Sequence, residues 1–224
     1  MRATAPVRRG RLPRSARRLQ LLDAALDVFV AQGYHAAAMD DIADRAGVSK
    51  PVLYQHFPSK LELYLALLDT SCEAVVAAVR EALDATEDNK ERVAATMRAF
   101  YTYVANDKAA FRLVFESDLM NEPAVRERIE RVTAANAAAI AAVIHDDTGL
   151  PAAQSELLAV SLVGMAQVSA RYLVSSDHLV DADEAVSLVS SLAWRGISGY
   201  PRTEGDGDTG AGSEDGAGDG TGDR

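Results

Sequence analysis

The stretch Asp40–Phe57, DDIADRAGVSKPVLYQHF, decides the fold of this chain of 224 residues. Its pattern predicts two short helices joined by Gly47-Val48-Ser49, because glycine is a common helix stop and serine a common helix N-cap. The apolar residues fall where they would pack these helices against each other: Ile42, Ala43, Val48, Leu53 and Phe57. The stretch therefore predicts a helix-turn-helix, a unit whose second helix enters the major groove of DNA.

The outward face of the second predicted helix consists of hydrogen-bond donors and carries no acidic residue. Its members are Ser49, Lys50, Tyr54, Gln55 and His56. Glutamine can pair with an adenine edge, lysine can hold a phosphate, and Val52 can contact a thymine methyl group. A plain αα-hairpin is the alternative; it needs the same packing but not this row of donors, so the pattern favours DNA binding.

Most of the remaining chain shows the apolar spacing of helices and no convincing strand pattern. The spacing and the Gly, Pro and Asx punctuation predict helices over 14–32, 39–46, 50–57, 60–83, 90–106, 108–120, 123–147, 151–174 and 181–198. The expected fold class is all-α with about nine helices. A basic arm (1–13) precedes them, and an acidic glycine-rich tail (201–224) that cannot bury enough apolar surface to become ordered follows.

Charge is distributed unevenly along the chain. The net charge is −10, yet residues 1–60 carry ten Lys and Arg against five Asp and Glu, a local charge of +5. A local basic face, rather than the charge of the whole chain, binds a phosphate backbone. We expect Arg8, Arg9, Arg11 and Arg14 to contact DNA, with a purely solubilising arm as the alternative.

The stretch from Leu22 to Leu68 resembles the N-terminal domain of the TetR/AcrR family of bacterial transcriptional regulators. The residues that carry the resemblance are Phe29, Gly33-Tyr34, Asp41-Ile42-Ala43, Ala46-Gly47-Val48-Ser49, Leu53-Tyr54, His56-Phe57 and Ser59-Lys60. One departure is that Ala37 and Ala38 stand where the family usually has Ser or Thr before the second helix. The capping hydroxyl is therefore missing there, and Asp40 and Asp41 are left to complement the helix dipole.

The resemblance implies roles for individual residues. Ser49 and Lys50 match positions that contact DNA at the start of the recognition helix, and Pro51 and Val52 match positions that touch bases. Tyr54, His56 and Lys60 match residues that grip phosphates. It also implies a DNA-binding domain over 14–60 and an effector-binding and dimerisation domain over 61–200.

The C-terminal half is expected to form the dimer and to hold an effector. The resemblance places the dimer on the last two helices, about 151–174 and 181–198, where we expect contacts from Ala159, Leu162, Val163, Ala166, Val186, Val189, Leu192 and Ala193. Tyr101, Phe111, Phe115, Met165 and Tyr172 are the candidate effector contacts, and Phe100, Tyr103, Met120 and Trp194 are further large side chains there. Asn136, Gln167 and Arg171 are polar side chains that could orient a ligand.

Catalysis is not expected. The sequence contains no G-x-S-x-G, H-E-x-x-H or phosphate-binding glycine loop, and its one cysteine, Cys72, lies mid-helix. His145-Asp146-Asp147 resembles metal ligands only superficially, because adjacent helical residues point in different directions; neither metal nor cofactor is expected. One cysteine and no apolar run near 20 residues favour a cytoplasmic protein outside the membrane.

The sequence therefore predicts a homodimeric regulator of transcription that acts as a repressor. It would bind a palindromic operator in double-stranded DNA and be released by a small apolar ligand. The alternative is a constitutive DNA-binding protein with a filled C-terminal core and no effector.

Overall fold

The computed structural model describes residues 12–106, 108–115, 119, 121–175 and 180–197, and all regular structure in them is α-helical. The helices are α1 (Arg14–Ala36), α2 (Met39–Arg45), α3 (Lys50–His56), α4 (Lys60–Asp84), α5 (Asn89–Asn106), α6 (Lys108–Phe115), α7 (Pro123–Thr148), α8 (Ala152–Ser175) and α9 (Ala182–Ile197). The all-α class expected from periodicity is confirmed. Most of the predicted arm, with Arg8, Arg9 and Arg11, and the whole acidic tail lie outside the described residues.

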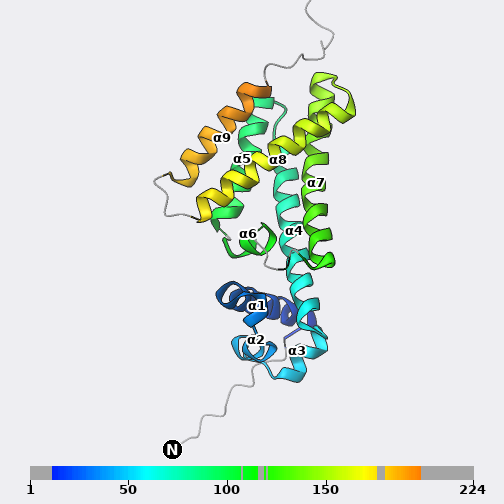
Figure 1. Ribbon diagram of the computed structural model, residues 1–224, viewed down its shortest axis with the longest axis vertical. Helices are drawn as coiled ribbons and strands as arrows, with labels where there is room; N and C mark the ends of the chain where they lie inside the picture. Colours follow the sequence, from blue (N-terminus) through cyan, green and yellow to red (C-terminus); the bar gives the residue numbers. More distant parts are fainter. Residues whose placement is uncertain (1–11, 107, 116–118, 120, 176–179, 198–224) are drawn as a thin grey trace, which may run out of the picture.

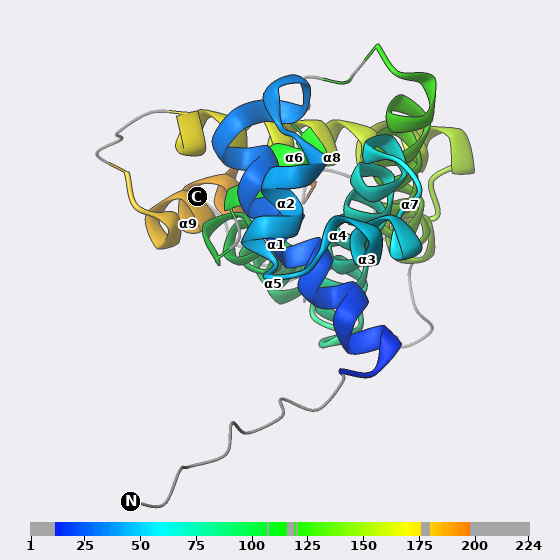
Figure 2. The same ribbon diagram turned by 90° about the horizontal axis from the view of Figure 1, so that it is seen from below.

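The helices form two lobes that share one long helix. Figure 1 shows α1, α2 and α3 together at one end of the molecule and α5, α7, α8 and α9 at the other, with α4 running from one lobe to the other. Seen from below in Figure 2, the three N-terminal helices cover the end of the bundle. Helix α6 contacts both α1 and α4, so the lobes are joined by packing as well as by the chain.

Local sequence signals set most of the helix ends. Helix α1 breaks at the predicted stop, Gly33, whose φ of 76° suits glycine. Ser59 caps α4 as expected, because its hydroxyl accepts a hydrogen bond from the backbone N–H of Glu62 at 3.1 Å. Helix α6 is described up to Phe115, and most of the rest of the range predicted for it, up to 120, lies outside the described residues.

Helix α8 differs from the expectation that no apolar run approaches 20 residues. The segment Ala152–Val174 is long and apolar enough to cross a membrane by length and composition, and most of it is not buried. This apolar run is inconspicuous in the sequence because alanine, serine and glycine stand between its larger apolar residues. The exposed side of α8 therefore needs an explanation of its own.

Candidate DNA-binding surface and effector cavity

The turn between α2 and α3 is a tight glycine cap. Gly47 has a φ of 64°, in the left-handed region that L side chains adopt only with strain. The N–H of Val48 donates to the Ala43 carbonyl at 3.0 Å, and the N–H of Gly47 donates to that of Asp44 at 3.0 Å. These two bonds make a Schellman motif, which satisfies the last carbonyls of α2 and fixes the direction in which α3 leaves.

Helix α3 places the predicted donors outward. Leu53 and Phe57 are buried against the other helices of the lobe, which leaves Ser49, Lys50, Pro51, Tyr54 and Gln55 exposed and Val52 and His56 half-buried. Ser49 occupies the N-cap position of α3, but its hydroxyl makes no capping hydrogen bond. This differs from the expected cap and leaves an exposed hydroxyl at the start of the helix without a capping role.

Lys50 is paired with an acid of the neighbouring helix. Its ammonium lies 2.8 Å from Oδ1 of Asp40 and 3.2 Å from Oδ2. The hydrogen bond and the charge of Asp40 raise the pKa of Lys50. Asp40 and Asp41 lie in the first turn of α2, which begins after Ala38 without a side-chain cap, as the missing hydroxyl predicted.

A basic cluster surrounds the end of α3. The guanidinium of Arg18 lies 4.3 Å from the centre of the Phe57 ring and donates to the His56 carbonyl at 3.5 Å. Burial, followed by the positive charges of Arg14, Arg18 and Arg17, lowers the pKa of His56. The N-terminal turn of α1 and the C-terminal turn of α3 therefore form one positively charged surface.

Lys60 is held by backbone groups. Its ammonium donates to the carbonyls of Tyr34 at 2.7 Å, Ala37 at 2.8 Å and His35 at 3.3 Å, and lies 4.5 Å from the Tyr34 ring centre. It thus holds the link between α1 and α2 against the start of α4. The phosphate contact expected for Lys60 stays a prediction, and would require the ammonium to give up some of these bonds.

The second lobe contains an apolar cavity of about 110 Å³. Its walls come from α4, α5, α7, α8 and α9, with Val79, Leu83, Val93, Met97, Phe100, Ile140, Val143, Ile144, Leu162, Val163, Ala166 and Trp194 as apolar lining. Asn89 and Phe100 both line it, and eleven helical residues span ~16 Å. The cavity is therefore narrow and long, a shape that suits a chain-like ligand.

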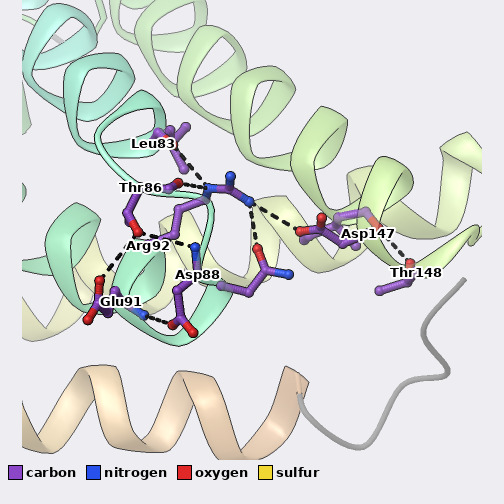
Figure 3. Close-up of polar contacts among 9 residues, drawn as sticks. Leu83, Thr86, Asp88, Glu91, Arg92, Asp147 and Thr148 are labelled. Carbon is purple, nitrogen blue, oxygen red and sulfur yellow. Dashed lines mark hydrogen bonds and ion pairs between the residues drawn. The ribbon is translucent and has the colours of Figure 1, made fainter. Parts of the chain in front are cut away.

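Arg92, one of the lining residues, is held by the set of hydrogen bonds that Figure 3 shows. Its Nε donates to the carbonyls of Leu83 at 3.0 Å and Thr86 at 3.1 Å. Its Nη1 donates to Asn89 Oδ1 at 2.6 Å and to Asp147 Oδ2 at 3.3 Å. Arg92 therefore caps the C-terminus of α4 and ties it to α7, a role that sequence could not indicate because two of its acceptors are backbone carbonyls.

The structure separates the candidate effector residues from this cavity. Tyr101 and Phe111 are buried in the main core, and Tyr101 Oη lies 2.5 Å from Ser169 Oγ of α8. Met165 packs on the same core, whereas the side chain of Phe115 lies outside the described part. The four candidates whose side chains the structure describes do not line the cavity: Tyr101, Phe111, Met165 and Tyr172. The effector roles of these residues stay untested, but Phe100, Asn136, Gln167 and Trp194 are the better placed candidates.

Tyr172 and the dimer residues show that the expected faces of α8 and α9 need correction. Tyr172 is 63% exposed, so its ring is not part of an internal wall. Of the expected dimer contacts, five are buried within the protomer: Ala159, Val163, Ala166, Val186 and Ala193. Leu192, also expected there, is exposed, and the other exposed apolar residues of the two helices are Leu157, Val160, Val168, Tyr172 and Leu188. Periodicity identified apolar helices but could not tell which face a neighbouring helix covers.

The potential catalytic and metal-binding groups have structural surroundings. Burial, reinforced by Asp69, raises the pKa of Cys72 to about 12, so its thiol is not a nucleophile near neutral pH. His145 Nδ1 lies 2.7 Å from the Leu150 carbonyl at the end of α7. Among the described residues, no group of three or more His, Cys, Asp or Glu could hold a metal ion.

Comparison with known proteins agrees with this arrangement. The family described as "Bacterial regulatory proteins, tetR family" matches residues 21–67, which cover α2, α3 and parts of α1 and α4. The HTH-type transcriptional activator FasR of Mycolicibacterium smegmatis is 49% identical over 197 residues, 88% of this chain and 90% of FasR.

Two solved structures extend the similarity to the whole fold. A TetR-like transcriptional regulator from Rhodococcus sp. RHA1 has a TM-score of 0.71 at 30% identity and covers 85% of this chain and 100% of that one. FadR from Bacillus subtilis, in complex with stearoyl-CoA, has a TM-score of 0.68 at 19% identity and covers 78% and 96% of the two chains. The helix-turn-helix of α2 and α3 (the recognition unit), the two-lobe fold and the long match to FasR lead to one conclusion: this chain belongs to the TetR family of bacterial transcriptional regulators.

Proposed function

We propose that the protein is a homodimeric transcriptional regulator whose DNA affinity is controlled by a slender apolar effector. One observation carries this proposal: the same helix lines the cavity and carries the recognition unit. Helix α4 contributes Val79 and Leu83 to the cavity wall and begins at Lys60, four residues after the end of α3. A ligand that moves the C-terminal half of α4 would therefore move the DNA-binding lobe.

A second copy of the chain is the proposed cover for the exposed side of α8 and α9. Val168 and Leu192 are each 64% exposed, and large exposed apolar side chains that gather on one side of a molecule mark an interaction site. Two α8–α9 pairs can form a four-helix interface about a two-fold axis. This arrangement would present two α3 helices to operator half-sites about 34 Å apart.

The DNA contacts proposed are those of the outward face of α3 and the adjacent basic cluster. Ser49, Lys50 and Gln55 are exposed at the tip of the lobe, where donors can reach bases and phosphates. Arg14 and Arg18 lie beside His56 and add charge for the phosphate backbone. The arginines of the arm are proposed to extend this contact.

The effector is proposed to act through the end of α4. Arg92 joins α4 to α7 at one end of the cavity, so a ligand that enters there must push against this group of hydrogen bonds. It shifts the equilibrium only by its difference in affinity for the two packings of the bundle. We propose that the bound form holds the two recognition helices at the wrong separation.

The sign of regulation is proposed to be activation rather than the repression first expected. FasR, which matches over most of both chains, is named a transcriptional activator. In this proposal the effector-free dimer on DNA raises transcription, and the effector ends it. In vitro transcription from the bound operator, with and without effector, distinguishes activation from repression.

The test uses the full chain and a duplex that it selects from a random library. Octadecanoate and octadecanoyl-CoA are the first probes, because a protein of similar fold was solved with stearoyl-CoA. We expect at least one probe to weaken DNA binding. Ala166→Leu should abolish this response while DNA binding persists, because Ala166 lines the cavity.

Ala138→Leu is the matched control, because it is the same substitution at an exposed alanine of α7 that is not part of the cavity lining. Its response to the probes should be unchanged. If neither probes nor a wider library of apolar ligands changed DNA affinity or thermal stability, the constitutive alternative would be correct.

A further inference from the structure

The cavity contains one deeply buried polar side chain that the protein itself does not satisfy. Asn136 of α7 is 4% exposed, and its Oδ1 has no hydrogen-bond partner. It stands in an alanine-rich stretch, AANAAAIAAVI, where an apolar residue would serve the core better. A buried amide oxygen without a donor destabilises the fold, so its presence requires a reason.

Apart from Thr96, the other polar residues of the lining have partners within the protein. Arg92 donates to both Asn89 and Asp147 at the cavity end. Thr148 Oγ1 donates to the Ile144 carbonyl at 2.6 Å, and Gln167 Nε2 donates to Thr133 Oγ1 at 3.3 Å. Among the described residues, Thr96 Oγ1, also in the lining, shares the condition of Asn136. Thr96 is only half-buried, and a change of its χ1 rotamer can bring the hydroxyl to a carbonyl of its own helix.

Asn136 also lies far from the polar end of the cavity. Eleven residues of α7 separate it from Asp147, which corresponds to ~16 Å along the helix axis. The walls between these two residues include Ile140, Val143 and Ile144 of the same helix. A ligand that reaches Asn136 must therefore pass its apolar part along these side chains.

We propose that Asn136 recognises a hydroxyl group carried by the buried part of the effector, which is then a hydroxylated apolar chain rather than a plain hydrocarbon chain. A hydroxyl both donates and accepts, so it can satisfy a side-chain amide in either orientation of its oxygen and nitrogen. A plain chain leaves the amide unsatisfied. This inference rests on the proposed function, because it concerns the ligand of the same cavity.

The experiment compares octadecanoate with its 2-hydroxy, 12-hydroxy and 18-hydroxy derivatives on the full chain, by calorimetry. The 12-hydroxy or the 18-hydroxy derivative, or both, should bind about 5- to 150-fold more tightly than octadecanoate. This is the factor expected when a buried polar group gains its partner. The 2-hydroxy derivative should show no such gain. Asn136→Leu should remove the preference, raise the melting temperature of the free protein, and leave binding of octadecanoate intact or improved.

Ile140→Val is the matched control, because Ile140 lies one turn along α7 in the same wall. It should change the affinities of all four probes by similar factors. If octadecanoate bound and matched or exceeded every hydroxylated derivative, the inference would be wrong and the proposed function would stand. A preference that persisted in Asn136→Leu would also overturn it. If no probe bound and DNA affinity never responded, the proposed function would fail, and this inference with it.

Discussion

Lys50 is the residue at which DNA binding and internal pairing compete. Its ammonium must reach a phosphate or base edge, yet in the free protein it is bonded to Asp40. Both side chains are more than half exposed, so water screens their attraction and the pair adds little to the stability of the fold. Its main effect is to lower the local positive charge of the recognition surface.

This competition predicts opposite effects for the two partners. Lys50→Ala should weaken binding to all DNA sequences and reduce the slope of log affinity against log salt by about one. Asp40→Asn should tighten binding by up to about 5-fold, because it releases Lys50. Fluorescence anisotropy over a salt series measures both. Asp41→Asn removes an equal charge from the same turn; an increase as large as that of Asp40→Asn would show that the pairing is irrelevant.

His56 predicts a dependence of stability on pH. Burial and the neighbouring arginines lower the pKa of His56 below its usual 6.5, so the unfolded chain binds a proton more readily than the folded one. The contribution to stability is present above the unfolded pKa and is lost as pH falls through the folded pKa. Urea denaturation at several pH values between 5 and 8 measures the free energy of unfolding. As pH falls, this free energy should decrease less for His56→Gln than for the parent protein. Identical pH profiles would contradict this assignment.

At the scale of the element, the recognition unit depends on backbone conformation at one glycine. A Cβ at Gly47 would meet no atom within 4 Å, so a side chain there causes backbone strain and no clash. Gly47→Ala should lower the free energy of unfolding by about 1–2 kcal/mol. Gly164→Ala, in the interior of α8 with equally open space, should instead raise it by up to about 1 kcal/mol. Chemical denaturation compares the two; a loss at both sites would contradict this explanation.

At the scale of the whole molecule, one hydrophobic core extends through both lobes and leaves several apolar residues of α8 and α9 exposed on the outer side of the bundle. Residues from α1 to α9 belong to one cluster of buried side chains, so movement in one lobe is resisted in the other. The exposed apolar residues of α8 and α9 lie outside this cluster. Their burial by a second copy would also fix the distance between the two recognition helices.

The proposed dimer predicts a change of oligomeric state. Val168→Glu and Leu192→Glu should each convert the dimer to a monomer, because each places a charge in the apolar contact. Light scattering during gel filtration gives the mass directly. Leu19→Glu is the control: Leu19 is 58% exposed on α1, remote from the proposed contact, and the variant should remain dimeric. A parent protein that is already monomeric at micromolar concentration would refute the proposed interface.

The sequence by itself determined the helix-turn-helix, the outward donors of α3 and the helical character of the second lobe. These features rest on local signals: glycine stops such as Gly47, the Ser59 cap, and apolar spacing within single helices. Each acts within a few residues of its position. That is why the periodic pattern placed Leu53 and Phe57 inward correctly before any contact between helices was known.

Only the tertiary structure decided which residues line the cavity and which cover the outside. Tyr172 and Phe111 are both large rings in apolar helices, yet one is exposed and the other fully buried, because burial depends on the neighbouring helix rather than on the residue's own. The acceptors of Arg92 on Leu83 and Thr86 are carbonyls, which every residue has and no side-chain pattern reports. Periodicity thus gives each helix an apolar face, and the packing of the other helices decides what that face contacts.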